Sequence, residues 1–207
     1  MTADASTMHA ETGTLASLKL AGLAFAVLAA QFMTVIMIAA SMAPLYDIRG
    51  GAISDLGVIP ETAWPFNASL VLTGVLNALG GYLLYRVRGG LIGAVFSVLA
   101  GLGAIGAGLI PLNGGGWHGL FALFAFVFFN VQTLITAWRL DNAMRGLGLI
   151  LGAIGMAYVL VMAIGDAGTP AIFGTIGHGG AERMIVYPPM LWLMIFGGYL
   201  MAAPARR

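Results

Sequence analysis

The sequence predicts an all-α integral membrane protein, a bundle of six transmembrane helices with both termini in the cytoplasm. Two observations predict this fold class. The chain is 60% hydrophobic and has a mean hydropathy of +0.96, far above the value of a soluble domain. In addition, apolar runs of about 20 residues, the length that a helix needs to cross a bilayer, recur along the whole chain. With 207 residues, the chain is expected to form one domain.

The elements follow in order from the N-terminus. Residues 1–18 are small and polar, which predicts a short disordered cytoplasmic tail ahead of a transmembrane domain at 19–207. The six spans are expected at 20–43, 66–85, 90–111, 117–138, 147–165 and 184–203. The first span ends in AASMA, which resembles a signal-peptide cleavage site. Its apolar part is longer than the roughly 7 to 15 residues of a signal peptide, so we expect an uncleaved helix.

The distribution of Lys and Arg predicts the orientation. If six helices alternate in direction, one side of the membrane receives Lys19, Arg86, Arg88, Arg139, Arg145, Arg206 and Arg207. The other side receives only Arg49 and Arg183. Because cytoplasmic loops carry the excess of Lys and Arg, both termini are predicted to be cytoplasmic. We therefore expect a multi-pass protein of the inner or plasma membrane.

Small and polar residues inside the spans predict how the helices pack. Small residues recur four apart, at Ala100, Ala104 and Gly108 and again at Gly148 and Gly152. This spacing lets helix backbones approach each other closely in lipid, so a compact bundle is expected. Five amide side chains at membrane depth are expected to form hydrogen bonds between helices, the alternative being that they line a pathway: Gln31, Asn67, Asn77, Asn130 and Gln132.

Composition also limits the partners. The net charge is only +1 and the basic residues are scattered, which excludes nucleic acid as a partner. The chain has no cysteine, so disulfides and thiolate metal sites are excluded. The lipid bilayer is the expected surrounding, and whether the chain forms a homo-oligomer stays open.

A cluster of polar residues is predicted at the non-cytoplasmic face. The stretch YDIRGGAISDLG follows the first span and carries Ser54 and Asp55, while His118 begins the fourth span. Glu182 and Arg183 precede the sixth span, so three separate loops bring polar groups to the same side. We expect Ser54, Asp55, His118, Glu182 and Arg183 to converge there. We also expect Asp55 to form an ion pair or a charge-assisted hydrogen bond with Arg183 or His118.

Three interpretations of this cluster stay open. The carboxylates can be helix caps and counter-ions with a purely structural role. The cluster can instead bind a lipid headgroup or small molecule, with Arg49 and Arg183 as anion contacts. Finally, His118, His178, Asp55 and Glu182 are weak candidates for a metal site, because His178 and Glu182 lie four apart, although no HExxH motif is present.

The preferred functional hypothesis is a non-enzymatic membrane module that binds a lipid, a small molecule or a partner at this cluster. Under it no cofactor is expected. The alternative is a metal-assisted hydrolase that acts on lipid at the outer leaflet, with zinc as its cofactor. Whether the chain is an enzyme therefore stays open at this point.

Four stretches of the chain carry a family resemblance. AISDLG, WPFNASLVLTG, IPLNGGGWHGLFAL and GGAERMIVYPPMLWL resemble the bacterial and archaeal membrane family called domain of unknown function 998. The resemblance implies a six-helix membrane protein of unassigned activity, and it adds Asn67 to the candidate ligand-binding residues. The positions that match the family are Ser54, Asp55, Gly57, Asn67, His118, Gly119, Glu182 and Arg183.

Overall fold

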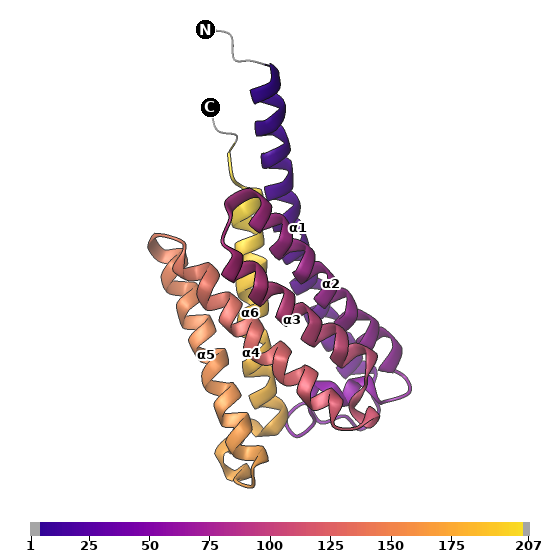
Figure 1. The fold of residues 1–207 in the computed structure, drawn as a ribbon. Coiled ribbons are helices and arrows are strands. Elements are labelled where there is room, and N and C mark those ends of the chain that lie inside the picture. Colours follow the sequence, from indigo (N-terminus) through magenta and orange to yellow (C-terminus); the bar gives the residue numbers. More distant parts are fainter. Residues whose placement is uncertain (1–4, 205–207) are drawn as a thin grey trace.

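The computed structural model describes the backbone of residues 5–204, and the side chains of residues 13–204 except Asn142. Six long α-helices and three short 3₁₀ helices make up this part of the chain, and it contains no strand (Figure 1). The long helices are α1 (Ala5–Met42), α2 (Ala63–Arg88), α3 (Leu91–Leu109), α4 (Trp117–Trp138), α5 (Asn142–Asp166) and α6 (Gly177–Met201). The short ones are η1 (Ile53–Gly57), η2 (Leu112–Gly114) and η3 (Pro170–Ile176). All six long helices are long and apolar enough to cross a membrane.

The six predicted spans are confirmed, and the largest differences concern two helix starts. Helix α1 already begins at Ala5, so residues 5–18 are helical where a disordered tail was expected. Ala, Met, Leu and Glu in this stretch favour helix, and extending a long helix costs less than nucleating one. Helix α6 begins at Gly177 rather than at 184. Residues 1–4 of the predicted tail lie outside the described residues.

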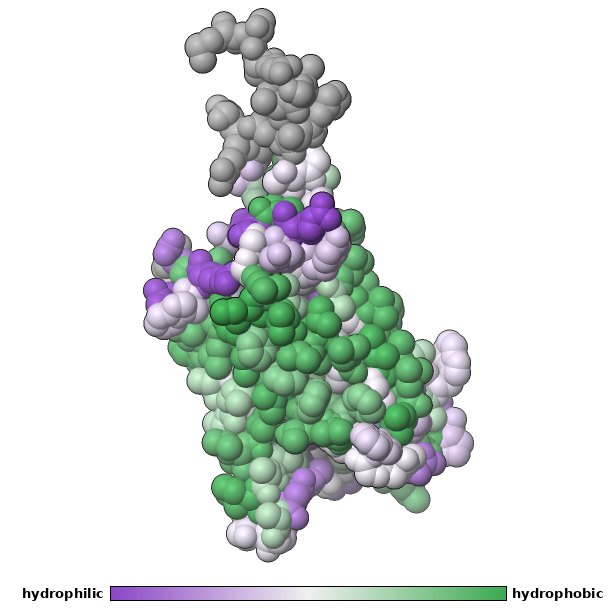
Figure 2. All heavy atoms as spheres, in the orientation of Figure 1, coloured by the Kyte–Doolittle hydropathy of each residue, from purple (hydrophilic) through white to green (hydrophobic). Residues whose placement is uncertain are grey.

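The helices form a closed ring in sequence order. Each helix packs on the next one along the chain, and α6 returns to pack on α1. The start of α1 and the end of α6 lie at the same end of the bundle (Figure 1), as an even number of crossings requires. We call this the terminal end. The opposite end, which carries residues 43–62, 110–116 and 167–176, is called the loop end. Figure 2 shows a hydrophobic band between these two more hydrophilic ends.

Small residues bring the helices into contact, as the sequence predicted. Ala100 and Ala104 are fully buried. Gly74 of α2 and Gly101 of α3 face each other so closely that a Cβ on either one would strike the backbone oxygen of the other. This close approach gains dispersion contacts that compensate for the missing hydrophobic force between helices in lipid.

The predicted hydrogen bonds between helices are confirmed for four of the five amide side chains, whereas Asn67 binds the carbonyl of Gly57 in the loop before its own helix. The side-chain amides of Asn77 on α2 and Gln132 on α4 donate to each other's oxygens over 2.8 and 3.0 Å. Gln31 of α1 donates to the Thr73 hydroxyl of α2 over 2.7 Å and accepts from the Ser69 hydroxyl over 2.6 Å.

Asn130 of α4 repairs a gap in the backbone hydrogen bonds of α6. Pro189 lies inside α6, and because proline has no N–H, it cannot donate to the carbonyl of Ile185 four residues earlier. The Asn130 amide donates to that carbonyl instead, over 3.1 Å, and also to the Phe126 carbonyl of its own helix over 2.8 Å. An interior proline in a membrane helix is tolerated where a neighbour pairs the freed group in this way.

The orientation stays a prediction, which reporter fusions can test. We expect a cytoplasmic signal from reporters fused after Arg88 and after Arg207, because the terminal end carries most of the Lys and Arg. A reporter fused after Asp166 should instead give an external signal. The swapped pattern would place the loop end in the cytoplasm.

Candidate functional site

The loop between α1 and α2 folds over the start of α6. The backbone N–H of Gly179 donates to the Arg49 carbonyl over 2.9 Å. Gly177 has a φ of 68°, and a Cβ on Gly177 or on Gly179 would strike the backbone of the loop. Glycine weakens helices, so Gly177, Gly179 and Gly180 by themselves disfavour a helix start here. The packing of the loop on these glycines explains why α6 nevertheless begins there.

Arg183 is a clamp for this loop. Its guanidinium donates to the carbonyls of Ile48 and Gly179 over 3.0 and 2.8 Å, and to the Tyr46 hydroxyl over 2.8 Å. The Tyr46 hydroxyl donates in turn to the Ala52 carbonyl over 2.7 Å. Burial raises the pKa of the Tyr46 phenol, so the hydroxyl keeps the proton that it donates. The hydrogen bonds that Arg183 donates therefore go to backbone carbonyls of the protein and to Tyr46.

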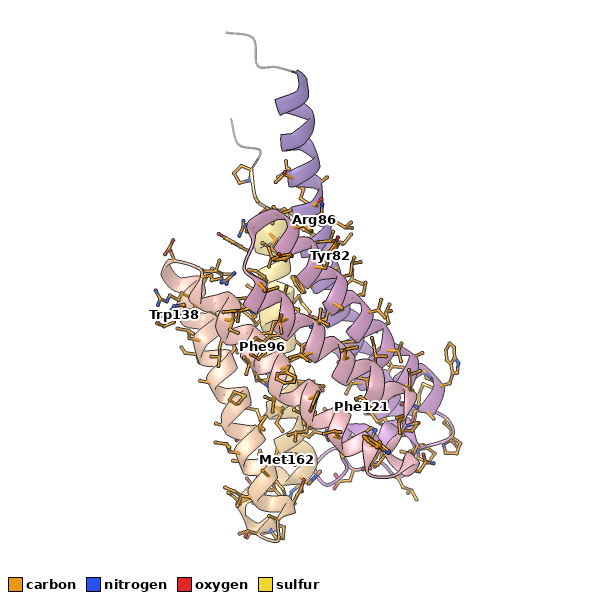
Figure 3. All side chains as sticks on the ribbon, viewed as in Figure 1. Tyr82, Arg86, Phe96, Phe121, Trp138 and Met162 are labelled. Atoms are coloured by element: carbon orange, nitrogen blue, oxygen red, sulfur yellow. The ribbon has the colours of Figure 1, made fainter. Side chains whose placement is uncertain are left out.

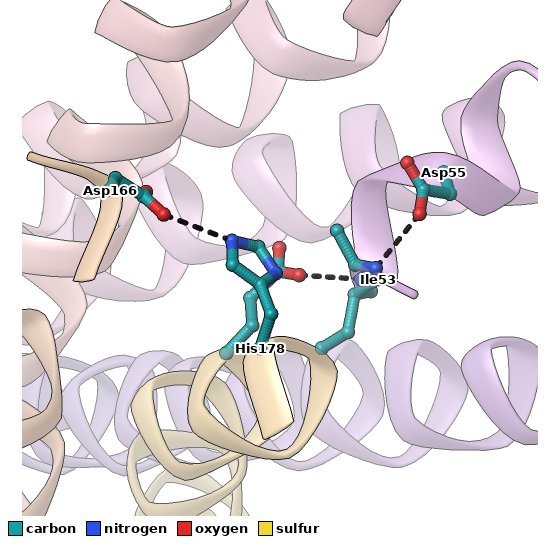
Figure 4. A network of polar contacts seen from close by, with 6 residues as sticks. Ile53, Asp55, Asp166 and His178 are labelled. Carbon is teal, nitrogen blue, oxygen red and sulfur yellow. Dashed lines mark hydrogen bonds and ion pairs between the residues drawn. The ribbon is translucent and has the colours of Figure 1, made fainter. Parts of the chain in front are cut away.

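Glu182, the residue before Arg183, holds the same loop from inside. Its side chain is only 5% exposed, and its carboxylate accepts from the backbone N–H of Ile53 over 2.5 Å (Figure 4). The backbone N–H of Ser54 also points to this carboxylate. Two backbone donors at the start of η1 thus compensate for the burial of a polar group.

The expected partner of Asp55 was wrong. Its carboxylate accepts from the backbone N–H of Ala52 over 2.8 Å and so caps η1 (Figure 4). Arg183 binds backbone carbonyls instead, since the loop brings several of them within reach. In the described part of the chain, the one ion pair joins His178 and Asp166 over 3.3 Å.

Asn67 also ties the loop to a helix. Its amide donates to the Gly57 carbonyl over 2.8 Å. A Cβ on Gly57 would lie 2.6 Å from the Asn67 side-chain oxygen, so this contact needs a glycine. Asn67 lines neither of the two cavities found at the loop end, which gives it a structural position.

His118 is buried at the start of α4 with one ring nitrogen in use. Its Nδ1 lies 2.7 Å from the Ile110 carbonyl, and the side chain is 4% exposed. Because a carbonyl oxygen can only accept, Nδ1 carries the hydrogen of this bond. The other nitrogen, Nε2, has no hydrogen-bond partner, and His118 lines both cavities of the loop end.

The larger of these cavities, the loop-end pocket, has a volume of about 670 Å³. It lies between α4 and α5, which diverge towards the loop end so that α6 is seen between them (Figure 1). Its polar wall consists of Ser54, Asp55, His118, Asp166, His178 and Glu182. Its apolar wall includes Leu123, Phe126, Val159 and Met162. Figure 2 shows hydrophilic atoms within the hydrophobic face between the lower parts of α4 and α5, and Figure 3 places Met162 on α5 at this level.

A smaller inner cavity of about 60 Å³ continues from this pocket into the bundle. Its lining is almost entirely apolar, and it shares Ser54, His118 and Glu182 with the loop-end pocket. These three side chains therefore lie where the two cavities meet. The Ser54 hydroxyl is half-buried and has no hydrogen-bond partner.

The structure brings together Ser54, Asp55, His118 and Glu182 of the predicted cluster, and it assigns Arg183 and Asn67 to the packing of the loop. Arg49 does not line the pocket either, so the two predicted anion contacts are absent from its lining. Among the side chains that the structure describes, no three His, Asp or Glu side chains are grouped so that they could hold a metal ion. The four weak metal candidates thus form no ligand set.

The sequence did not predict the apolar wall or the role of Asp166. Asp166 ends α5 and binds His178, whose ring also packs edge-on against Phe173 at a centroid distance of 5.2 Å. An acidic residue at the very end of α5, as Asp166 is, could have indicated from the sequence that it belongs to the polar cluster. The sequence carries no such signal for the apolar wall, because lipid-facing and pocket-facing residues of a membrane helix are equally hydrophobic.

Fold and site together define a polytopic membrane protein of six helices with a half-polar pocket at one end. The family profile described as "Protein of unknown function (DUF998)" matches residues 12–199, nearly the whole chain. The chain belongs to this family, which confirms the resemblance found in its sequence. No match was found among curated proteins or among solved structures.

Proposed function

We propose that the chain is a membrane module that binds a lipid, or a small molecule of lipid-like polarity, in the loop-end pocket. The observation that carries this proposal is the division of one pocket into a polar and an apolar wall. A headgroup fits against Ser54, His118 and Glu182. A chain fits against Leu123 and Phe126 of α4, facing α5.

The position of the pocket supports entry from the bilayer. Its lining extends along α4 from His118 to Phe126, so it reaches about 12 Å along the helix axis. Leu123 on this lining is 48% exposed on the membrane-facing surface. A volume of about 670 Å³ is also within the usual range of small-molecule pockets.

The charges of the pocket favour a headgroup that donates hydrogen bonds. The lining carries three carboxylates, from Asp55, Asp166 and Glu182, and two histidines, but no Lys or Arg. Nε2 of His118 and the Ser54 hydroxyl are free to accept. An amine or a hydroxyl suits these groups better than a phosphate, which would face like charge.

The rival hypothesis of a metal-assisted hydrolase gains no support from the donor geometry. It required His118, His178, Asp55 and Glu182 to share one metal ion, and such a group is absent from the described residues. His178 binds Asp166, and Glu182 accepts backbone N–H groups. Binding is therefore the function that this arrangement supports best.

Photo-crosslinking tests the proposal. The protein is reconstituted in nanodiscs with phosphatidylethanolamine that carries a diazirine on its acyl chain. We expect the label to concentrate on peptides from the loop-end halves of α4 and α5, because these line the apolar wall. Ala163→Trp should reduce this labelling several-fold, since Ala163 lines the pocket and a large ring would fill it.

Ala68→Trp is the matched control. Ala68 is also an exposed alanine near the loop end, but it lies on α2 and outside the pocket. This variant should be labelled like the wild type. Labelling spread evenly over all helices, with no loss in Ala163→Trp, would contradict the proposal.

A further inference from the structure

A second polar cavity, the terminal-end pocket, lies at the opposite end of the bundle from the proposed lipid site. It has a volume of about 230 Å³ and is formed between the α2–α3 turn and the last turn of α4. Its polar groups include Arg88 and Arg139, and no Asp or Glu lines it. Its floor is apolar, with Leu84, Ile135 and Phe196.

The two guanidinium groups have no protein partner. Neither Arg88 nor Arg139 forms a side-chain hydrogen bond or an ion pair within the described residues. By contrast, Arg86 donates to the Tyr82 hydroxyl over 2.8 Å, and Arg145 stacks on Trp138 with 4.0 Å to the ring centroid. The arginines of this pocket thus differ from their neighbours in having all donors free.

The backbone around the pocket positions Arg139. Gly90 has a φ of 91°, which glycine adopts without strain, and a Cβ there would overlap the Arg139 guanidinium. Arg139 therefore lies directly over the turn that joins α2 to α3. Arg88, at the end of α2, is at the same turn.

We infer that the terminal-end pocket binds the phosphate group of an anionic phospholipid from the surrounding leaflet. Guanidinium groups are well suited to phosphate, because they offer paired N–H donors and a permanent positive charge. Basic pockets between transmembrane helices commonly receive such headgroups. The apolar floor beneath the arginines suits the glycerol and the first carbons of the acyl chains, which free phosphate lacks.

Thermal unfolding in a mild detergent tests this inference. Phosphatidylglycerol should raise the unfolding temperature of the wild-type protein by several degrees. Phosphatidylcholine and inorganic phosphate at the same concentration should have much less effect. Arg88→Gln and Arg139→Gln should each reduce the shift, and the double variant should abolish it, because each removes charged donors from the pocket.

Arg86→Gln is the matched control, since Arg86 shares the last turn of α2 with Arg88 but does not line the pocket, and it binds Tyr82 instead (Figure 3). It should retain the full shift. Native mass spectrometry of each single variant, counting bound phosphatidylglycerol, gives a second readout that does not depend on the double variant. Equal shifts with phosphatidylcholine would overturn the inference, as would an unchanged shift in both single variants. If inorganic phosphate raised the unfolding temperature as much as phosphatidylglycerol, the pocket would bind phosphate itself and not specifically a lipid.

Discussion

Arg183→Met should lower the free energy of unfolding in mixed micelles by about 2 kcal/mol, the scale of one or two hydrogen bonds to a charged group. Arg183 is the clamp that joins α6 to the carbonyls of the first loop and to Tyr46. Methionine keeps most of the aliphatic volume but removes every donor. The loop should consequently exchange its backbone amides faster, which hydrogen exchange over residues 46–53 would detect.

Arg49→Met serves as the control for this prediction. Arg49 belongs to the same loop, but its side chain is exposed and has no hydrogen-bond partner. Its replacement should change the stability by less than about 0.5 kcal/mol, as is usual for such surface sites.

In addition, Arg183→Met and Asp55→Ala should have additive effects, since the two side chains do not interact. A strong coupling between the two substitutions would instead indicate that Asp55 and Arg183 form an ion pair, contrary to the backbone contacts in the structure.

Asn130→Leu should also destabilise the bundle, by about 1.5 kcal/mol, because it leaves a buried carbonyl without a partner. Leucine branches at Cγ as asparagine does, and although it is larger it cannot donate to Ile185. Pro189 has no N–H to replace this donor, so the Ile185 carbonyl would face an apolar interior. Unfolding in mixed micelles measures the loss.

A second substitution tests the cause of this loss. Pro189→Ala should recover part of the stability of Asn130→Leu, since an alanine N–H can donate to the Ile185 carbonyl within α6. Pro188→Ala is the matched control. It restores a donor to Met184 instead and leaves the Ile185 carbonyl unpaired, so it should give no comparable recovery. Equal recovery from both prolines would refute the role of Asn130 as a substitute donor.

The loop that these contacts stabilise is also part of the proposed binding site. Glu182 accepts from the Ile53 N–H and at the same time lines the point where the two cavities meet. Ser54, next to Ile53, also lines both cavities, and its hydroxyl has no hydrogen-bond partner. A single pair of adjacent residues, Glu182 and Arg183, thus fixes the loop and shapes the polar wall of the loop-end pocket.

The sequence by itself determined the class of fold and the location of most spans. The span expected at 117–138 has the bounds of α4, because apolar length and interfacial tryptophans mark both ends. The sequence also predicted that Ser54, Asp55, His118 and Glu182 come to one end. Helix alternation places the loops in which they lie on the same side, whatever the packing.

Only the tertiary structure decided what each of these groups contacts. An arginine at the edge of a membrane needs hydrogen-bond partners, but the sequence does not show whether these are a carboxylate or backbone carbonyls. In the structure, Arg183 binds carbonyls of a loop more than 130 positions away. The start of α6 at Gly177 could not be predicted from the sequence either, because glycine disfavours a helix. Only the structure shows that the loop packs so closely on Gly177 and Gly179 that a side chain would not fit there. The apolar wall of the pocket depends on how α4 and α5 diverge, and hydrophobic periodicity cannot distinguish a surface that faces lipid from one that faces a cavity.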